Sequence, residues 1–430
     1  AENIFIYPSV DVAWQFSKLN LFLGSPILTF GKLRLAYGEV GVEPPPYNTQ
    51  SIYVSPNYSD SYGGSLSTDL FGAGSFTPSQ DLGDPKLSPE IKKEYEIGTD
   101  LRFLDNKIKI GYSYYYNKTE DVFFNLSLAN SSGYDEIFTN AGEIENKGME
   151  VDFTYDIISI NDFRISLNAN WSFYRNKVLD LKGVESIRLG GLSAVSGRAV
   201  EGYPLGVFWG TKFARNDDGT IFLNSNGFPT LDLESGVIGD PHPDWQGGLG
   251  TTLSWKDLSL FFLFERYHGA DIYAGTRAVL LNYGRHKDSA VETTAQKDLF
   301  DYNGGLITSG TIFRGSVHDF GAGDVALTEP WYRGIGGYFS GVQEQFVEDG
   351  SWTRLRELTL SYSLRTPKFI KSTKLSSIDF SFTGRNLFIW TDFIGNDPDT
   401  NLTEVSTTRG IDYFNNPGTK SYVFKILINY

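Results

Sequence analysis

The sequence contains no cysteine in 430 residues. It therefore offers no disulfide framework, no thiolate ligand for a metal ion and no cysteine nucleophile. Long apolar runs are also missing: Leu258–Phe264 is among the longest, far short of the roughly 20 residues of a membrane-spanning helix. Acidic residues outnumber basic ones, 52 to 37, and the net charge of −15 argues against a nucleic-acid binder, which needs a basic stripe.

Aromatic residues and glycine are abundant instead. Tyrosine (25) and phenylalanine (32) bring the aromatic content to 15%, which favours strands, and 46 glycines suit turns and loops. A chain of 430 residues is too long for one compact soluble core, but a closed barrel grows simply by adding strands. The composition is thus compatible with one large β-barrel or with two or three soluble domains.

The last ten residues show a clear strand pattern. Their alternation gives an extended chain with one fully apolar face, formed by Tyr422, Phe424, Ile426, Ile428 and Tyr430. Such a strand fits the core of a soluble sheet as well as it fits a membrane barrel. In a barrel the terminal tyrosine would lie in the aromatic girdle at the membrane–water interface.

A hairpin is predicted around Asp105-Asn106. A two-residue turn there would pair Phe103 with Ile108, and this register places the apolar residues of both strands on one face and the charges on the other. A shift by one residue would mix the two faces, so the pattern specifies the register. Similar alternation along the chain indicates about eleven strands, most of them near the 9–11 residues of a tilted transmembrane strand.

The connections between these strands alternate between short and long. Short connections follow Phe16, Leu104, Ile158, Trp255 and Leu364. Long connections follow Glu39, Asn117, Lys177, His268 and Trp390. Soluble sandwiches rarely sort their loops in this way, whereas outer-membrane barrels have short periplasmic turns and long extracellular loops. We therefore predict an all-β fold, an antiparallel transmembrane β-barrel, with a periplasmic C-terminus.

An odd number of strands leaves such a sheet without closure. Bacterial single-chain barrels normally have an even number of strands, and an open edge in lipid leaves unsatisfied backbone groups that cost several kcal/mol each. Ala1–Phe16 already has the pattern of a strand, and no signal peptide is visible at the start. We therefore expect residues 1–430 to be a C-terminal portion of a larger barrel, closed by strands outside this sequence.

Four stretches carry a resemblance to a known family: Thr139–Glu150, Glu348–Tyr362, Gly384–Phe388 and Gly410–Lys420. With them, the chain resembles from end to end the C-terminal half of SusC/RagA-type TonB-dependent outer-membrane transporters. The resemblance implies a barrel of about 22 strands, of which this chain would supply the second half, strands 12 to 22. It also implies an N-terminal plug, a TonB-contacting segment and a signal peptide, none of which is in this sequence.

The same resemblance implies a function and partners. SusC/RagA-type proteins import oligosaccharides or peptides with energy passed through TonB, and a SusD-like surface lipoprotein commonly caps the barrel. The chain is therefore expected in the bacterial outer membrane, as part of a nutrient transporter with no cofactor and no enzymatic activity. Two alternatives remain: a SusC-like barrel that serves as a structural subunit of a larger outer-membrane assembly, and a passive porin.

The charged faces of the predicted strands are the candidate lumen wall of such a transporter: Glu94, Glu96, Asp100, Arg102, Lys107, Lys109, Glu150, Asp152 and Arg164. Alternatively, these residues form a solvated wall or contact the plug, with cross-strand charge pairs worth ~0.2–1 kcal/mol. The apolar face of the last strand would then contact outer-membrane lipid. We hypothesise that this face, up to Tyr430, is also the signal by which the barrel assembly machinery recognises the protein.

Other candidate residues lie in the connections. Aromatic residues there either stack on sugars or a capping partner, or pack within their own loops: Tyr47, Tyr53, Tyr58, Trp209, Trp331, Tyr332 and Tyr338. Trp245 is expected in the interface girdle instead. Asn216–Gly219 and Asp397–Asp399 are oxygen-rich but lack the EF-hand spacing, so we interpret them as turns. The connection Arg365–Leu375 has room for one helical turn, and the four histidines show no zinc-type spacing.

Overall fold

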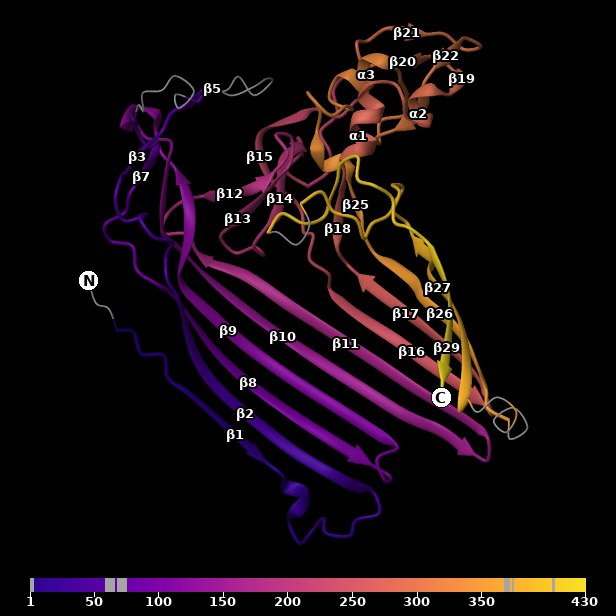
Figure 1. Cartoon of the computed structure of the whole chain (residues 1–430). Helices are drawn as coiled ribbons and strands as arrows, with labels where there is room; N and C mark the ends of the chain where they lie inside the picture. Colours follow the sequence, from indigo (N-terminus) through magenta and orange to yellow (C-terminus); the bar gives the residue numbers. More distant parts are fainter. Residues whose placement is uncertain (1–3, 59–65, 68–75, 367–371, 373–374, 404–406) are drawn as a thin grey trace.

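The computed structural model describes residues 4–58, 66–67, 76–366, 372, 375–403 and 407–430. Its main element is one large antiparallel sheet (Figure 1). Eleven strands follow one another in this sheet, as predicted: β1 (Ser9–Trp14), β2 (Leu28–Val42), β8 (Glu90–Phe103), β9 (Ile108–Ser127), β10 (Glu136–Ile160), β11 (Phe163–Asp180), β16 (Trp245–Trp255), β17 (Leu258–His268), β26 (Trp352–Leu364), β27 (Ser377–Thr391) and β29 (Ser421–Asn429).

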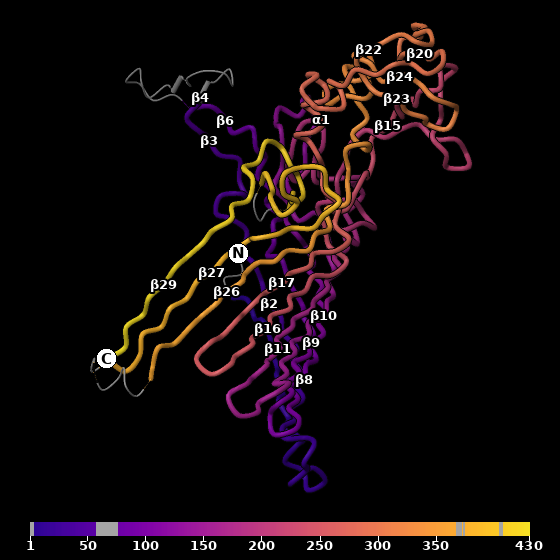
Figure 2. Tube along the Cα trace, turned by 90° about the vertical axis from the view of Figure 1, so that its right-hand side faces the viewer, coloured from indigo at the N-terminus to yellow at the C-terminus, as the bar shows by residue number. Residues whose placement is uncertain are grey.

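The sheet is open and curved. Each strand pairs with the one before it and the one after it in this series, so that β1 and β29 form the two edges. Because these edges do not pair with each other, the described residues do not close on themselves into a barrel. Figure 2 shows that β26, β27 and β29 turn out of the plane of β8–β11, which makes the face seen in Figure 1 concave.

The long connections gather at one end of the sheet and the short turns at the other, as the loop lengths predicted (Figure 1). Among the described residues, no helix is both long and apolar enough to cross a membrane. Most of the connection Arg365–Leu375, with its expected helical turn, lies outside the described residues.

The registers confirm the predicted hairpin, but its turn is longer than expected. Phe103 pairs with Ile108, so the connection is the four residues from Leu104 to Lys107. Leu104, Asp105 and Asn106 all have positive φ values, between 51° and 67°. Three successive left-handed residues reverse the chain without a two-residue turn, a conformation that alternation alone does not reveal.

Two predicted boundaries are wrong. Lys118–Lys147 was expected to be a long connection, but β9 continues to Ser127 and β10 begins at Glu136. The backbone ladder continues past the end of the apolar alternation because its hydrogen bonds do not require apolar side chains, and shifts of register around Gly142 accommodate the irregular pattern. At the other end of the chain, the strand within residues 4–16 begins only at Ser9.

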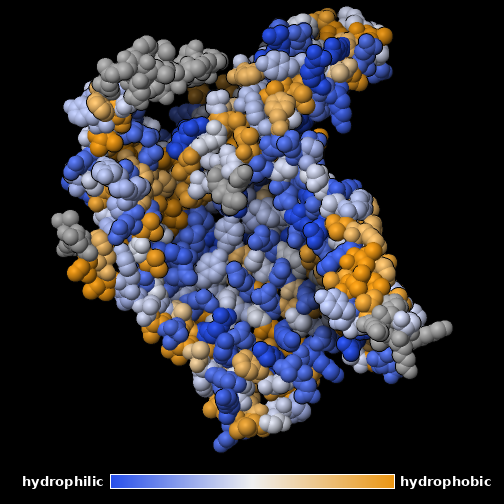
Figure 3. Space-filling model, viewed as in Figure 1, coloured by the Kyte–Doolittle hydropathy of each residue, from blue (hydrophilic) through white to orange (hydrophobic). Residues whose placement is uncertain are grey.

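The pairing places most apolar residues of neighbouring strands on the convex face and most polar ones on the concave face, with Phe261 and Leu263 of β17 as exceptions on the concave side. On β9 the convex face carries Ile108, Ile110, Tyr112, Tyr114 and Tyr116. From β8 to β11, no outward residue between the turns and the aromatic girdle carries a charge. The concave face is mainly hydrophilic along its middle (Figure 3). This division is typical of a membrane barrel, with lipid outside and a polar interior.

The long connections fold into smaller modules beyond the sheet. Residues 181–244 contain a four-stranded sheet of β12 (Ser186–Gly191), β13 (Ser196–Val200), β14 (Val207–Phe213) and β15 (Leu231–Gly239). Residues 269–351 contain β18 (Asp271–Ala274), α1 (Gly275–Asn282), α2 (Lys287–Ala290), β19 (Glu292–Thr294), β20 (Leu299–Phe300), β21 (Leu306–Ile307), β22 (Ile312–Arg314), β23 (Ser316–Asp319), β24 (Asp324–Leu327), α3 (Glu329–Arg333), η4 (Gln343–Phe346) and β25 (Val347–Asp349).

The remaining elements are short. They are η1 (Phe16–Lys18), β3 (Tyr53–Val54), β4 (Asn57–Tyr58), β5 (Leu66–Ser67), β6 (Thr77–Pro78), β7 (Asp81–Leu82), η3 (Asn130–Ser132) and β28 (Ile411–Asp412). β7 pairs with β10, and β28 pairs with β18. The last long connection therefore packs against the 269–351 module.

Candidate functional site

The concave face of the sheet is the candidate functional surface. Eight of the nine predicted wall residues lie on this concave face. The register between β8 and β9 places four of them there: Glu94, Glu96, Asp100 and Arg102. The registers of β10 and β11 continue the same face. The exception is Lys107, which lies exposed in the turn between β8 and β9. Sequence alternation counted it with the wall because the turn was taken to be shorter.

The first strands carry the paired charges of this wall. Lys32 Nζ lies 2.8 Å from Asp100, and the Arg34 guanidinium lies 3.6 Å from Asp100 and 3.8 Å from Glu96. Lys92 reaches Glu94 at 2.6 Å. All of these side chains are partly exposed, so each pair contributes about 0–1 kcal/mol to stability. Their effect is to neutralise this part of the wall.

The middle strands carry unpaired charges. Glu150 and Asp152 of β10 are exposed on the concave face, and neither forms an ion pair within the described part of the chain. The basic residues lie nearer the short turns, where Arg102 and Lys109 are opposite each other and Arg164 is the second residue of β11. Arg102 also stacks over the ring of Phe30, 4.9 Å from its centroid. On these strands Glu150 and Asp152 lie at mid-height, and the bases lie nearer the turns together with the carboxylate of Asp156.

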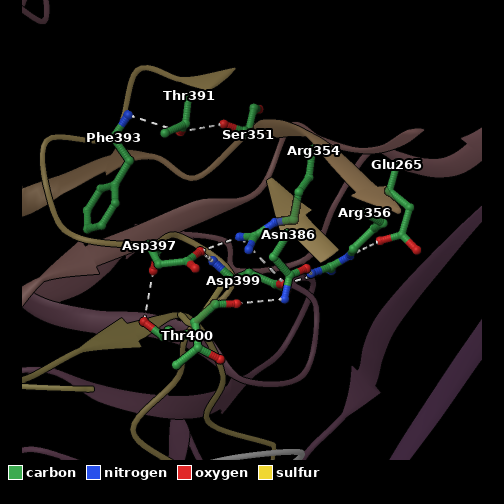
Figure 4. Close-up of polar contacts among 11 residues, drawn as sticks. Glu265, Ser351, Arg354, Arg356, Asn386, Thr391, Phe393, Asp397, Asp399 and Thr400 are labelled. Carbon is green, nitrogen blue, oxygen red and sulfur yellow. Dashed lines mark hydrogen bonds and ion pairs between the residues drawn. The ribbon is translucent and has the colours of Figure 1, made fainter. Parts of the chain in front are cut away.

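A second group of charges lies where β17 and β26 reach the long connections (Figure 4). Arg354 is only 4% exposed and donates to Asp397 over 2.5 Å, with Asp399 3.8 Å away. Arg356 bonds to Asp399 at 2.7 Å and to Glu265. Two arginines of the wall therefore bind two carboxylates of the last long connection and hold that loop against the concave face.

A β-bulge explains how β26 presents so many polar groups there. The pairing with β17 shifts between Leu355 and Glu357, which leaves Arg356 as an extra residue. Arg356 and Glu357 both point inward as a result, although strict alternation would send one of them to lipid. Trp352 completes the group, with both guanidinium carbons, those of Arg354 and Arg356, within 5.2 Å of its ring centroid.

Sequence reasoning did not identify this network. Asp397–Asp399 was interpreted as a turn, and the backbone does turn there. In addition, the Asp397 side chain forms an ion pair with Arg354, which lies 43 positions earlier in the chain. The signal present in the sequence was the pair of arginines at Arg354 and Arg356 in a strand whose other alternate residues were apolar. Asn216–Gly219 does form a turn: Gly219 N–H donates to the Asn216 carbonyl.

Several loop aromatics prove to be core residues. Trp331, Tyr332 and Tyr338 are 3%, 7% and 4% exposed and pack together with Phe228 and Tyr273. Loop self-packing, the alternative to sugar stacking, therefore describes these three. By contrast, Tyr47 and Tyr53 are exposed, Trp209 lies under the Arg198 guanidinium, and the Tyr58 side chain lies outside the described part of the chain. The Trp245 ring packs at a tilt of 50° against His268, its partner at the outer end of β17.

Buried polar groups tie the outer module together. The Tyr273 hydroxyl donates to Gln343 Oε1, and burial raises the tyrosine pKa. Burial also raises the pKa of Asp271, and the charges of Asp240 and Asp349 nearby add to this effect. A cavity of about 800 Å³ opens between α1, β22 and α3. Tyr273, Gln343 and Asp271 belong to this outer module and lie outside the polar wall.

The comparisons with known proteins agree with this architecture. The family model described as TonB dependent receptor-like, beta-barrel matches residues 2–387. The chain is 26% identical to TonB-dependent receptor P3 of Formosa agariphila, over 97% of the chain and 41% of that protein. It is 23% identical to TonB-dependent receptor SusC of Bacteroides thetaiotaomicron, over 91% of the chain and 37% of that protein.

A solved structure shares the fold. The structure of the RagAB peptide transporter matches with a TM-score of 0.71 at 19% identity, over 99% of this chain and 43% of the other. The chain thus spans about two fifths of the length of the relatives it matches. Because the family model covers most of the sequence, the chain belongs to the TonB-dependent receptor-like β-barrel family, a non-enzymatic family of the bacterial outer membrane.

Proposed function

We propose that this chain is the C-terminal part of a SusC/RagA-type transporter that imports oligosaccharides or peptides with energy from TonB. The open edges of the sheet support this proposal most strongly, because β1 and β29 each leave a row of backbone groups that lipid cannot satisfy. Strands outside the sequence would close the barrel, at about 22 strands in all. A plug and a TonB-contacting segment would belong to the same missing part.

The polar wall suits transport of hydrophilic molecules. In a closed barrel, Glu150 and Asp152 would project into the interior as free carboxylates, while the bases near the turns would face the periplasmic exit. Such a charge distribution attracts cationic groups at mid-height and discriminates between charged solutes. A plug that contacts these residues is the alternative role for them.

A SusD-like lipoprotein is the proposed partner. The 269–351 module projects furthest from the sheet (Figure 1) and exposes large apolar side chains, among them Tyr283, Leu306, Ile312 and Phe339. Exposed apolar groups of this kind favour a protein contact. TonB and the barrel assembly machinery are further expected partners, the second through the apolar face of β29.

Energy coupling separates the three functions. Uptake of labelled maltohexaose and of a labelled pentapeptide would be measured in cells with and without TonB. An active importer loses uptake of its substrate when TonB is absent, whereas a passive porin retains it. A structural subunit shows no uptake in either strain and co-purifies with assembly or secretion machinery, and that result would overturn the proposal.

The wall has its own test. The double variant Glu150→Gln/Asp152→Asn should lower uptake of a cationic peptide relative to a neutral one, by up to about tenfold at low ionic strength. The matched control is Glu145→Gln, on the same strand but on the convex face. An unchanged ratio in the double variant would assign these carboxylates to the plug contact instead.

A further inference from the structure

The 269–351 module contains a cavity that lies outside the concave wall. The cavity opens between α1, β22 and α3, at the end of the molecule where the long connections gather (Figure 1). All of its lining residues lie between Leu281 and Arg333, so a single connection forms the whole cavity. Its volume of about 800 Å³ is within the roughly 300–1,000 Å³ typical of pockets that bind small molecules. The module can therefore hold a ligand of its own.

The charged side chains of this cavity balance one another. Two acids and two bases line it: Asp301, Glu329, Arg314 and Arg333. Arg333 pairs with Glu329 at 3.4 Å, and Asp301 Oδ1 accepts from the Gly305 N–H at 2.7 Å. The Arg314 guanidinium donates from Nε and Nη2 to two backbone carbonyls, each 3.2 Å away. The cavity thus has no net charge, and each of its ionic groups is already held by the protein, which suits a neutral ligand.

Hydrogen-bonding groups of both kinds remain available to such a ligand. The Asn282 amide, which can both donate and accept, forms no hydrogen bond with any residue that the structure describes. Arg314 Nη1 is a further donor, and Asp301 Oδ2 a further acceptor, without a partner in the described part of the chain. Sugar hydroxyls donate and accept at the same time, and neighbouring hydroxyls match the paired atoms of an amide, a carboxylate or a guanidinium.

Aromatic rings supply the apolar part of the lining. Tyr332 is buried within the cavity wall, and its hydroxyl lies 3.2 Å from that of Ser316. Tyr283 is 64% exposed at the rim, where its ring meets Phe339 at 77° with 5.9 Å between the centroids. A contact at this angle leaves at least one face of the Tyr283 ring open. The C–H face of a sugar ring can pack on such a surface while its hydroxyls reach the polar groups.

We propose that this cavity is a capture site for a neutral oligosaccharide. One sugar ring stacks on Tyr283, and the hydroxyls of the next bind Asn282, Asp301 and Arg314. This inference rests on the proposed function, because the captured glycan is the one that the barrel imports. Since Tyr283 also belongs to the apolar surface proposed for the lipoprotein, the glycan binds beside that partner. A charged peptide is disfavoured, because a cavity without net charge compensates poorly for the desolvation of ionised termini.

The test uses the full-length receptor purified in mild detergent, so that binding is measured in the absence of TonB. The probes for titration calorimetry are neutral hexasaccharides of glucose, mannose and xylose, a galacturonic acid hexasaccharide and a neutral pentapeptide. At least one neutral hexasaccharide should bind with saturation. Because the cavity has no net charge, the affinity should be the same in about 50 mM and about 500 mM NaCl.

Substitutions locate the binding. Tyr283→Ala should weaken binding of that hexasaccharide about tenfold through loss of the stacked ring, and Asn282→Ala roughly fivefold through loss of its hydrogen bonds. Tyr283→Trp should retain binding, because the indole also offers a flat ring. The matched control is Phe300→Ala, which removes an exposed aromatic ring of the same module that does not line the cavity. This control should bind as the unaltered receptor does.

Three outcomes would overturn the proposal. The first is the absence of binding by every neutral hexasaccharide. The second is tighter binding of the galacturonic acid hexasaccharide or of the pentapeptide, which would assign the cavity to a charged glycan or to peptides. The third is unchanged affinity in Tyr283→Ala and Asn282→Ala with normal heat-modifiable mobility, which would place the glycan in the lumen. Failure of the proposed function differs from all three, because it appears as uptake that does not need TonB and leaves binding to the purified receptor unaffected.

Discussion

Substitution of Phe262 by arginine should destabilise the barrel far more than an arginine on the other face at the same depth. Phe262 points to the convex face, between Thr251 and Leu358 on the neighbouring strands, and its ring packs edge-on against Phe264, 5.9 Å away. An arginine there must place its guanidinium in hydrocarbon or bend it toward an interface.

The depth of this position sets the magnitude. Phe262 is four residues beyond Leu258, the first residue of β17 after the turn. At about 3.3 Å per residue and a tilt of about 40°, it lies roughly 10 Å from the turn side of a band about 25 Å tall. It is therefore near the midplane, where an arginine costs about 2–4 kcal/mol. This corresponds to a roughly 30- to 700-fold shift of the unfolding equilibrium.

The assay compares Phe262→Arg with two controls. Thr252→Arg lies at nearly the same depth but on the concave face, opposite Phe261, and Ser259→Arg lies on that face nearer the turn. Both arginines would be solvated by the interior, so their cost should be small. Outer-membrane yield and the denaturant midpoint of the purified protein measure the effect. Equal losses in Phe262→Arg and Thr252→Arg would refute the assignment of the two faces.

Three further predictions concern the loops and the C-terminus. Arg354→Leu should release the segment around Asp397, because an unpaired buried carboxylate costs about 3–5 kcal/mol. Amide hydrogen exchange should therefore rise in that segment. The double variant Arg354→Leu/Asp397→Leu should restore most of the protection. Deletion of Tyr430 should lower the yield of assembled barrel, and unchanged heat-modifiable mobility would contradict the assembly-signal hypothesis. Because the folded state binds the Asp271 proton more tightly than the unfolded state, the stability of the outer module should fall as the pH rises above about 3.9. The resistance of this module to protease should fall over the same range. Asp271→Asn should flatten the dependence of protease resistance on pH.

The transmembrane part of the fold was predictable because one physical rule governs it. Lipid on one side and a polar interior on the other force alternation of period two, and this alternation fixes strand number, register and faces together. The pairs Phe103–Ile108 on β8 and β9 and Phe382–Phe424 on β27 and β29 follow directly from it. Loop length then predicts the orientation of the sheet, because outer-membrane barrels have short turns on the periplasmic side and long loops on the extracellular side.

The remainder depends on contacts between distant residues, which no local pattern reveals. β9 and β10 continue as strands through Glu120 and Glu143, where alternation no longer separates apolar from polar side chains. Trp331 and Tyr338 are residue types common in binding surfaces, but their burial depends on distant partners, such as Phe228, which lies 103 positions before Trp331. Likewise the bulge at Arg356 breaks the rule of alternation at the point where the wall binds the last loop.

The extension of β9 and β10 beyond the apolar band has a mechanical consequence. Phe124, Ala141 and Ile144 on these extensions pack with Val178 of β11 and with Ile187 of β12, all of them almost fully buried. The ends of β9–β11 and the β12–β15 sheet are thereby joined through a shared hydrophobic core. Because this core fixes the β12–β15 sheet to the long strands, the amides of the shared core should exchange as slowly as those of the barrel.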